Sequence, residues 1–243
     1  VTKDLPTLPH AFTNAAITYC DGIVYLAGGE NTTEALTQFL FLDMQHPEKG
    51  RQVLPSLLQP TSHGVLVVQW GKEGRNIYLL GGRKKTISGV SELYRQVYAF
   101  NLDTKVWGEE TPLPYALSAG TGMANGTCSI LLFGGDRGET FHQTEKLIAA
   151  IKEERDETKK ENLNKQKAAL QSAHPGFSKE VLAYNTITRQ WQTVSNIPFN
   201  APVTTTAVCW DGKAYLPSGE IRAGVRTPQI LEAAIKWKVE ACR

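Results

Sequence analysis

The sequence lacks long apolar runs and lacks an excess of charge of either sign. No apolar run approaches the roughly 18–20 residues that a membrane-spanning helix requires. The net charge is only +2, from 26 basic and 24 acidic side chains, which is too small for the basic footprint of a nucleic-acid-binding protein. We therefore expect neither a membrane nor a nucleic acid as a partner.

The sequence also has few cysteines and histidines, and none are clustered. Cys20, Cys128, Cys209 and Cys242 form no C-x-x-C pair and have no adjacent histidine. A metal site or a redox motif is therefore not expected, and neither is a cofactor. Cys20 and Cys209 occupy matching places just before Asp-Gly turns, so we interpret them as small apolar residues of equivalent strands rather than as a disulfide.

What the sequence does have is an internal repeat, in which an apolar strand ends in a pair of glycines. The three clear copies are Ile-Val-Tyr-Leu-Ala-Gly-Gly (23–29), Ile-Tyr-Leu-Leu-Gly-Gly (77–82) and Ile-Leu-Leu-Phe-Gly-Gly (130–135). Their first glycines, Gly28, Gly81 and Gly134, are 53 residues apart, and a weaker copy ends at Gly219. This period is typical of kelch repeats, which fold as blades of an all-β propeller.

Each unit divides into four strands, so the sequence predicts one propeller domain over residues 1–243. The blades are expected at about 10–57, 62–112, 116–195 and 202–240. Trp107, Trp191 and Trp237 recur on the outer strand and are interpreted as packing anchors between blades. Because ring closure must cover the first and last blades, we expect these four to be part of a six-bladed ring. A closed four-bladed ring is the alternative.

One segment breaks the period, since the interval from Gly134 to Ser218 grows to 84 residues. Residues 145–171 contain no glycine or proline and consist mainly of strong helix formers. We therefore expect a helical insertion at 141–175, in the third blade. We interpret it as a lid or a wall of a site, because long insertions in compact domains are often functional. A solvated helical hairpin laced by i,i+4 pairs is the alternative.

Charged and polar residues gather on the loops of one face. In a four-stranded antiparallel blade, the loops after strands 2 and 4 emerge on the same side. That side should carry Asn31, Arg83 and Arg137 after the glycine pairs, and His63 before a first strand. We expect these four residues to contact a bound ligand, and His63 is a candidate general acid.

The stretch Ser218-Gly-Glu-Ile-Arg-Ala-Gly-Val-Arg-Thr-Pro228 departs most from the repeat. The diglycine becomes Ser-Gly, a carboxylate follows at once at Glu220, and Arg222 and Arg226 lie close behind. This Gly-Glu-x-x-x-Gly-x-Arg-Thr stretch, in a kelch chain with a helical insertion one blade earlier, resembles the N-acetylneuraminate epimerases. These are the sialic acid mutarotases, and the chain looks most like their cyclically permuted branch. The resemblance covers essentially all 243 residues.

The resemblance implies a six-bladed ring and an isomerase that interconverts the α and β anomers of N-acetylneuraminate by acid–base catalysis. On the matching positions it implies Glu220 as the proton acceptor and Arg226 as its catalytic partner, with a small sugar acid as the binding partner. It also implies a periplasmic location, with the cytoplasm as the alternative. The sequence begins at Val1, which we expect to be a processing boundary. A homo-oligomer is compatible with the sequence.

The residues suit this chemistry in their own right. A positioned carboxylate can accept the anomeric hydroxyl proton, and such general acid–base help is worth about 10²–10⁴-fold. An arginine fork matches the planar carboxylate of a sialic acid, so Arg226 could anchor it and Arg222 is a second candidate anchor. The structural alternative is that Glu220 and Arg226 only pair with each other across a turn.

Two other function classes fit the repeat. A non-catalytic kelch module that binds proteins or glycans would use the same scaffold, because a fold does not fix a function. A different sugar-active propeller is the second. The Ser-x-Asp-x-Gly-x-Thr-Trp boxes of sialidases are absent, and five scattered histidines do not supply the clustered ligands of a copper radical oxidase.

Overall fold

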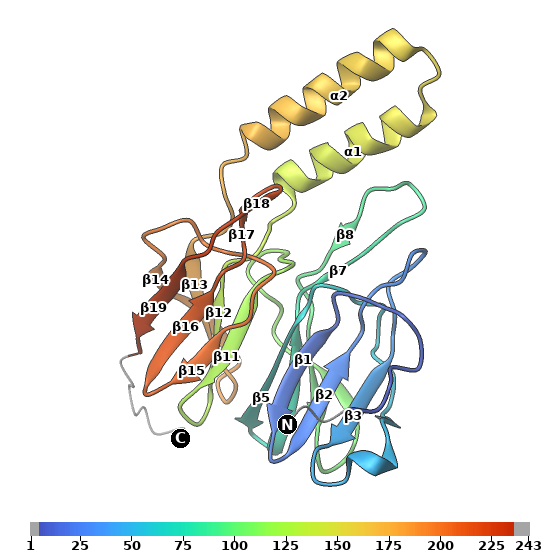
Figure 1. Cartoon of the computed structure of the whole chain (residues 1–243). Helices are drawn as coiled ribbons and strands as arrows, with labels where there is room; N and C mark the ends of the chain where they lie inside the picture. The colour runs from blue at the N-terminus through green and yellow to red at the C-terminus, as the bar shows by residue number, and fades with distance from the viewer. Residues whose placement is uncertain (1–4, 236–243) are drawn as a thin grey trace.

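The computed structural model describes residues 5–235, which fold almost entirely into antiparallel β-sheets (Figure 1). Four sheets follow one another along the chain, and one unit of the sequence repeat builds each of them. Because all neighbouring strands within a sheet are antiparallel, each unit has the form of a propeller blade. Neither helix in the described part of the chain is long and apolar enough to cross a membrane.

The first two blades each contain four strands. The first blade is formed, in sheet order, by β1 (Ala16–Cys20), β2 (Ile23–Ala27), β3 (Phe39–Asp43) and β4 (Gln52–Val53), with a short 3-10 helix at Pro47–Lys49. The second is formed by β5 (Val65–Gly71), β6 (Gly74–Leu80), β9 (Val97–Asn101) and β10 (Trp107–Glu109). Between β6 and β9 the chain makes a small hairpin of β7 (Arg83–Lys84) and β8 (Glu92–Leu93).

The third and fourth blades also carry an insertion after their second strand. The third is formed by β11 (Thr121–Asn125), β12 (Ser129–Phe133), β13 (Glu180–Asn185) and β14 (Gln190–Asn196), with α1 (Glu139–Glu153) and α2 (Glu157–Ser172) between β12 and β13. The fourth is formed by β15 (Val208–Trp210), β16 (Lys213–Pro217) and β19 (Ile230–Ala234), with the hairpin β17 (Glu220–Arg222) and β18 (Val225–Arg226) between β16 and β19. All three insertions emerge on one side of the sheets, at the top of Figure 1.

The predicted strands are confirmed to within a few residues in the first three blades, and the helical insertion is confirmed as a two-helix hairpin. In the fourth blade the sequence predicts a first strand over residues 204–210, but β15 begins at Val208, and Thr204 turns the backbone with a φ of 50°. The predicted outer strand at Lys236–Val239, with Trp237, lies outside the described residues. The blade limits and the number of blades in the complete ring stay predictions.

Apolar side chains fill the space between neighbouring blades. One cluster joins the first and second blades around Phe39 and Phe100, a second joins the second and third around Tyr78 and Tyr184, and a third joins the third and fourth around Phe133. Such packing of sheet faces supplies most of the stabilisation of a propeller.

Two tryptophans of the outer strands take part in this packing. Trp107 lies with its ring centroid 5.1 Å from those of both Phe39 and Phe100. Trp191 stacks on Tyr184 at 4.7 Å. Each also donates its indole N–H to a carbonyl of the preceding connection, Pro55 or Thr111, at 3.0 Å. The prediction that these residues are packing anchors is confirmed for both.

Cys20 and Cys209 are free thiols, as the sequence analysis predicts. Cys20 packs against the cluster between the first and second blades, whereas Cys209 is exposed on β15. Cys209 is therefore not the packed apolar residue that its sequence position suggests. Cys242 lies outside the described residues.

The repeated glycines allow consecutive units to approach each other closely. Gly28, Gly81 and Gly134 have φ values of 66°, 57° and 65°. A side chain at Gly28 would place its Cβ 1.9 Å from the carbonyl oxygen of Thr61 in the next unit, and one at Gly81 would lie 2.3 Å from that of Leu117. Only glycine fits such a position, which explains why the diglycine recurs.

A second repeated feature links the blades near their first strands. β5 lies beside both β1 and β11. Shortly before the first strand of each of the four blades, one residue has a positive φ, between 50° and 57°: Asn14, His63, Ala119 and Thr204. The N–H of His63 donates to the carbonyl of Asn14 at 2.9 Å, that of Ala119 to His63 at 2.8 Å, and that of Thr204 to Ala119 at 3.1 Å. We call this series the inner backbone chain.

Candidate active site

Four charged side chains occupy one equivalent position, directly after the second glycine of each unit. They are Glu30, Arg83, Asp136 and Glu220. Each makes a backbone bridge to the residue that precedes a member of the inner backbone chain, as Thr13 does with Glu30 and Val203 does with Glu220. The repeat therefore brings these four groups to the same end of the blades, where the insertions also emerge.

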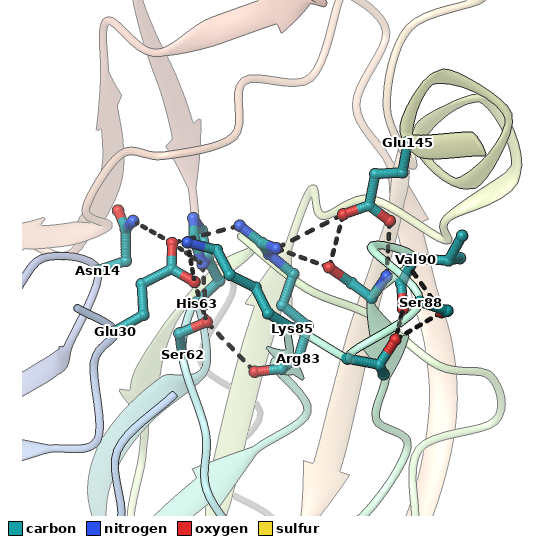
Figure 2. A network of polar contacts seen from close by, with 11 residues as sticks. Asn14, Glu30, Ser62, His63, Arg83, Lys85, Ser88, Val90 and Glu145 are labelled. Carbon is teal, nitrogen blue, oxygen red and sulfur yellow. Dashed lines mark hydrogen bonds and ion pairs between the residues drawn. The ribbon is translucent and has the colours of Figure 1, made fainter. Parts of the chain in front are cut away.

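Glu30 is the centre of a buried polar network (Figure 2). Its side chain is only 7% exposed, and its carboxylate accepts hydrogen bonds from Asn14 Nδ2 at 2.9 Å and from Ser62 Oγ at 3.1 Å. Arg83 Nη2 lies 3.4 Å from Oε1, and Lys85 Nζ lies 3.8 Å from Oε2. The carboxylate is thus surrounded by donors and cations, as a buried charge must be.

The network fixes the charge of its carboxylate, Glu30, and of the imidazole beside it, His63. Burial raises the pKa of Glu30, but Arg83, His63, Asn14 and Lys85 together outweigh burial and hold that pKa below its ordinary value. His63 lies 3.9 Å from Glu30 Oε1 and has a side chain only 12% exposed. Burial and then Arg83 lower the pKa of His63 to about 4, against the opposing effect of Glu30. At neutral pH Glu30 is therefore ionised and His63 is neutral.

Arg83 connects this network to the helical insertion (Figure 2). Its Nη1 donates to Ser91 Oγ at 2.9 Å and lies 3.9 Å from Glu145 of α1, and its guanidinium lies over the ring of Phe141 at 5.0 Å. Glu145 in turn accepts hydrogen bonds from the Ser91 N–H at 2.7 Å and from Ser91 Oγ at 2.6 Å. The guanidinium of Arg83 is therefore held between two carboxylates.

The root of the insertion lies at this end of the blades, whereas the two helices extend away from the sheets (Figure 1). Neither helix has a fully buried residue. Beyond α2 the chain returns past the fourth blade, where a side chain at Gly176 would place its Cβ 3.8 Å from the carbonyl oxygen of Ile221. The insertion thus contacts the β7–β8 hairpin and passes close to the β17–β18 hairpin. A role as a site wall or lid stays a prediction.

Glu220 and Arg226 lie opposite each other in the β17–β18 hairpin, as direct partners across its two strands. Glu220 is partly buried and accepts a hydrogen bond from the Gly224 N–H at 2.7 Å, whereas Arg226 and Arg222 are exposed. Across residues 5–235, neither arginine forms an ion pair. The alternative in which Glu220 and Arg226 merely neutralise each other is therefore not what the structure shows.

Two other predicted ligand contacts are already engaged by neighbouring groups. Arg137 pairs with Glu180 at 2.9 Å and lies over the ring of Tyr115 at 3.7 Å. Asn31 Oδ1 accepts hydrogen bonds from both the N–H and the hydroxyl of Thr33 at 2.8 Å, which closes its own loop. Their roles as substrate contacts stay predictions, and these bonds argue for a local structural role.

Sequence reasoning also places Glu30 and Lys85 on this face, because both follow a glycine pair in the loop after a second strand, but it did not identify Glu30 as the centre of a network. It did not identify Asn14, Ser62 or Glu145 as residues of this network. The repeat contained a usable signal, because Glu30 is the unit-one equivalent of Glu220. Glu145 carried no such signal, since it lies in a helix rich in charge where nothing local distinguishes it. No group of three or more His, Cys, Asp or Glu residues able to hold a metal occurs within residues 5–235.

The family model and the curated relatives that match this chain carry the same description. Residues 5–241 match a family model described as N-acetylneuraminate epimerase. The chain is 26% identical over 232 residues to the N-acetylneuraminate epimerase of Vibrio vulnificus (strain YJ016), an alignment that covers 93% of this chain and 58% of that protein. It is 25% identical over 243 residues to the N-acetylneuraminate epimerase of Brucella melitensis biotype 1, which covers 96% of this chain and 61% of that protein.

The solved structure of YjhT matches this chain with a TM-score of 0.77 at 20% sequence identity, over 98% of this chain and 68% of YjhT. At this identity the match shows that the two share a fold. The chain spans about three fifths of the length of the curated relatives it matches.

Proposed function

Since this chain belongs to the N-acetylneuraminate epimerase family, we propose that it interconverts the α and β anomers of N-acetylneuraminate. The observation that carries the proposal is the β17–β18 hairpin, where Glu220 and Arg226 lie opposite each other without forming an ion pair. A carboxylate and a guanidinium that stand on opposite strands of one hairpin, and do not neutralise each other, remain available to act on one bound ligand.

The reaction needs little beyond such a pair. Mutarotation opens a cyclic hemiketal, turns the exposed carbonyl and closes the ring on its other face. A base must accept the proton of the anomeric hydroxyl while the ring oxygen gains a proton. Glu220 serves as the base in this proposal. The N–H of Gly224 holds one carboxylate oxygen at 2.7 Å, which fixes the orientation of the side chain.

The carboxylate of the sugar sits on the same carbon as the anomeric hydroxyl, so its anchor must lie beside the base. Four arginines are candidates, and the structure separates them. Arg83 is held by Glu30 and Glu145, and Arg137 is held by Glu180. Arg226 and Arg222 are exposed and can offer a guanidinium fork to a carboxylate. Arg226 is the preferred anchor because it lies directly across from Glu220.

His63 does not suit the part of general acid at neutral pH. A general acid must carry the proton that it donates, and the low pKa of His63, about 4, leaves its ring neutral at pH 7. The buried network around Glu30 therefore acts in this proposal as the support for the site rather than as its proton donor.

The proposal is tested by following anomer equilibration by NMR after the α anomer is released enzymatically. The wild-type protein should accelerate equilibration, and Glu220→Gln should remove at least about 100-fold of that acceleration with an unchanged circular dichroism spectrum. Glu48→Gln is the matched control, because Glu48 is an exposed carboxylate of the first blade. Equal rates for Glu220→Gln and wild type would instead favour a binding module.

A further inference from the structure

One residue of the inner backbone chain has a backbone conformation that is unfavourable for its type of side chain. Asparagine and histidine adopt a positive φ more often than alanine does, and for a β-branched residue a positive φ is an outlier. Thr204 nevertheless has a φ of 50°. Strained positions of this kind gather at functional sites, where the side chain is kept for a reason other than stability.

The first blade shows what a side chain at this position can reach. Asn14 follows Thr13, the residue bridged to Glu30, and Asn14 Nδ2 donates to Glu30 Oε1 at 2.9 Å. The amide of Asn14 thus contacts the carboxylate that follows the glycine pair of its own blade. Figure 2 shows Asn14 directed toward Glu30 in this way.

In the fourth blade Thr204 stands to Glu220 as Asn14 stands to Glu30. It follows Val203, which exchanges two backbone hydrogen bonds with Glu220 at 2.8 and 3.0 Å. Its side chain is exposed, and within the described residues no group hydrogen-bonds to its hydroxyl. The neighbouring Thr205, by contrast, donates its hydroxyl to the carbonyl of Pro217 at 2.6 Å.

From this placement we infer that the Thr204 hydroxyl is a substrate contact, which hydrogen-bonds the oxygens on the anomeric carbon of the sugar acid while Glu220 takes the proton. The inference rests on the proposed function of Glu220. Threonine supplies both a donor and an acceptor, so one hydroxyl can follow the oxygen as it changes from hydroxyl to carbonyl and back. A site that needs a hydroxyl here accounts for a hydroxyl-bearing side chain at this strained position.

The test compares two substitutions by the same NMR assay. Thr204→Ser keeps the hydroxyl and should hold kcat/KM within about twofold of wild type. Thr204→Ala removes the hydroxyl and should lower kcat/KM about tenfold. Both remove the β-branch, so neither variant should melt below wild type. Ala119→Ser is the matched control, because it places a hydroxyl at the equivalent position of the third blade, which follows the residue bridged to Asp136 rather than the one bridged to Glu220.

The outcomes separate this inference from the proposed function. If Glu220→Gln is inactive but Thr204→Ala retains full activity, the Thr204 contact is wrong and the function stands. Equal losses in Thr204→Ala and Thr204→Ser would also overturn the contact, because the hydroxyl would then not be the group that matters. A wild-type protein that leaves the rate of anomer equilibration unchanged would overturn both.

Discussion

Glu30, His63 and Arg83 form a buried cluster with the exposed Lys85 beside it, and the charges of these groups depend on one another. At neutral pH the ionised Glu30 lies between two cations, and the histidine beside it carries no charge. The cost of burying these groups is offset only while each keeps its partners, since an unpaired buried charge is strongly destabilising. The cluster should therefore respond to pH in a range where most surface groups do not.

The stability of the protein should fall between about pH 6.5 and about pH 4. In the unfolded chain His63 takes up a proton at its ordinary pKa, near 6.5, whereas in the fold its pKa is about 4. The unfolded state thus binds the extra proton in this window, and stability is lost as the pH falls. The effect amounts to about 3 kcal/mol across the window for this one group.

His63→Asn should remove that part of the pH dependence, because asparagine tolerates the positive φ and does not titrate. Urea unfolding at pH 7, 6 and 5 measures the slope for each protein. His46→Asn is the control, since the His46 side chain is 52% exposed. Parallel slopes for wild type and His63→Asn would show that His63 is not the responsible group.

The helical insertion is attached to the blades by a few contacts near the start of α1. Glu145 binds the N–H and hydroxyl of Ser91 and faces Arg83, while α2 has no buried residue. These contacts fix the β7–β8 hairpin together with α1. We therefore expect substitutions at the far ends of the two helices to leave the blades undisturbed.

Glu145→Ala should release the β7–β8 hairpin. The Ser91 N–H loses its acceptor, so amide exchange in residues 88–93 should accelerate about tenfold or more, as measured by hydrogen–deuterium exchange with mass spectrometry. Glu161→Ala removes an exposed carboxylate of α2 whose ion pair within residues 5–235 is with Lys165, and it should leave residues 88–93 unchanged. Identical exchange in both variants would contradict the anchoring role of Glu145.

The elements were largely predictable because their signals are local. A strand that ends in Gly-Gly, a turn such as Asn101-Leu-Asp-Thr104 and a run of helix formers each depend on neighbours in sequence. The charged hairpin at Glu220 was also visible, because it interrupts a repeat. The Glu30 network and the bond from Glu145 to Ser91 could not be seen in this way, since they join residues from different blades. Their partners are decided by how the blades pack.

The two outer blades each present an apolar face that the described chain leaves uncovered. On the first blade Tyr19 is 65% exposed and Ile17 is 59% exposed, and on the fourth Trp210 is 72% exposed beside Val208 and Ile230. The faces between the four blades, by contrast, are packed. Faces of this kind are usually covered. A ring that includes further blades would cover both.

If the ring closes over these faces, a charge placed on either should destabilise the native protein. We expect Tyr19→Glu and Trp210→Glu each to lower Tm by at least about 5 °C, because each would bury an unpaired carboxylate. Ile87→Glu is the control, since Ile87 is fully exposed at the tip of the β7–β8 loop. Tm values equal to that of Ile87→Glu would mean that the two faces remain open to water.

The inner backbone chain has a direction, and this has a consequence for assembly. In each link the N–H of one blade donates to the carbonyl of the blade before it. The series therefore ends in the N–H of Asn14 on one side and in the carbonyl of Thr204 on the other. Any unit added next to Asn14 must offer an acceptor, and any unit added next to Thr204 must offer a donor. Blades can therefore join only head to tail. A designer who wished to lengthen or shorten the propeller could keep this polarity by exchanging whole units cut at the same residue of the repeat.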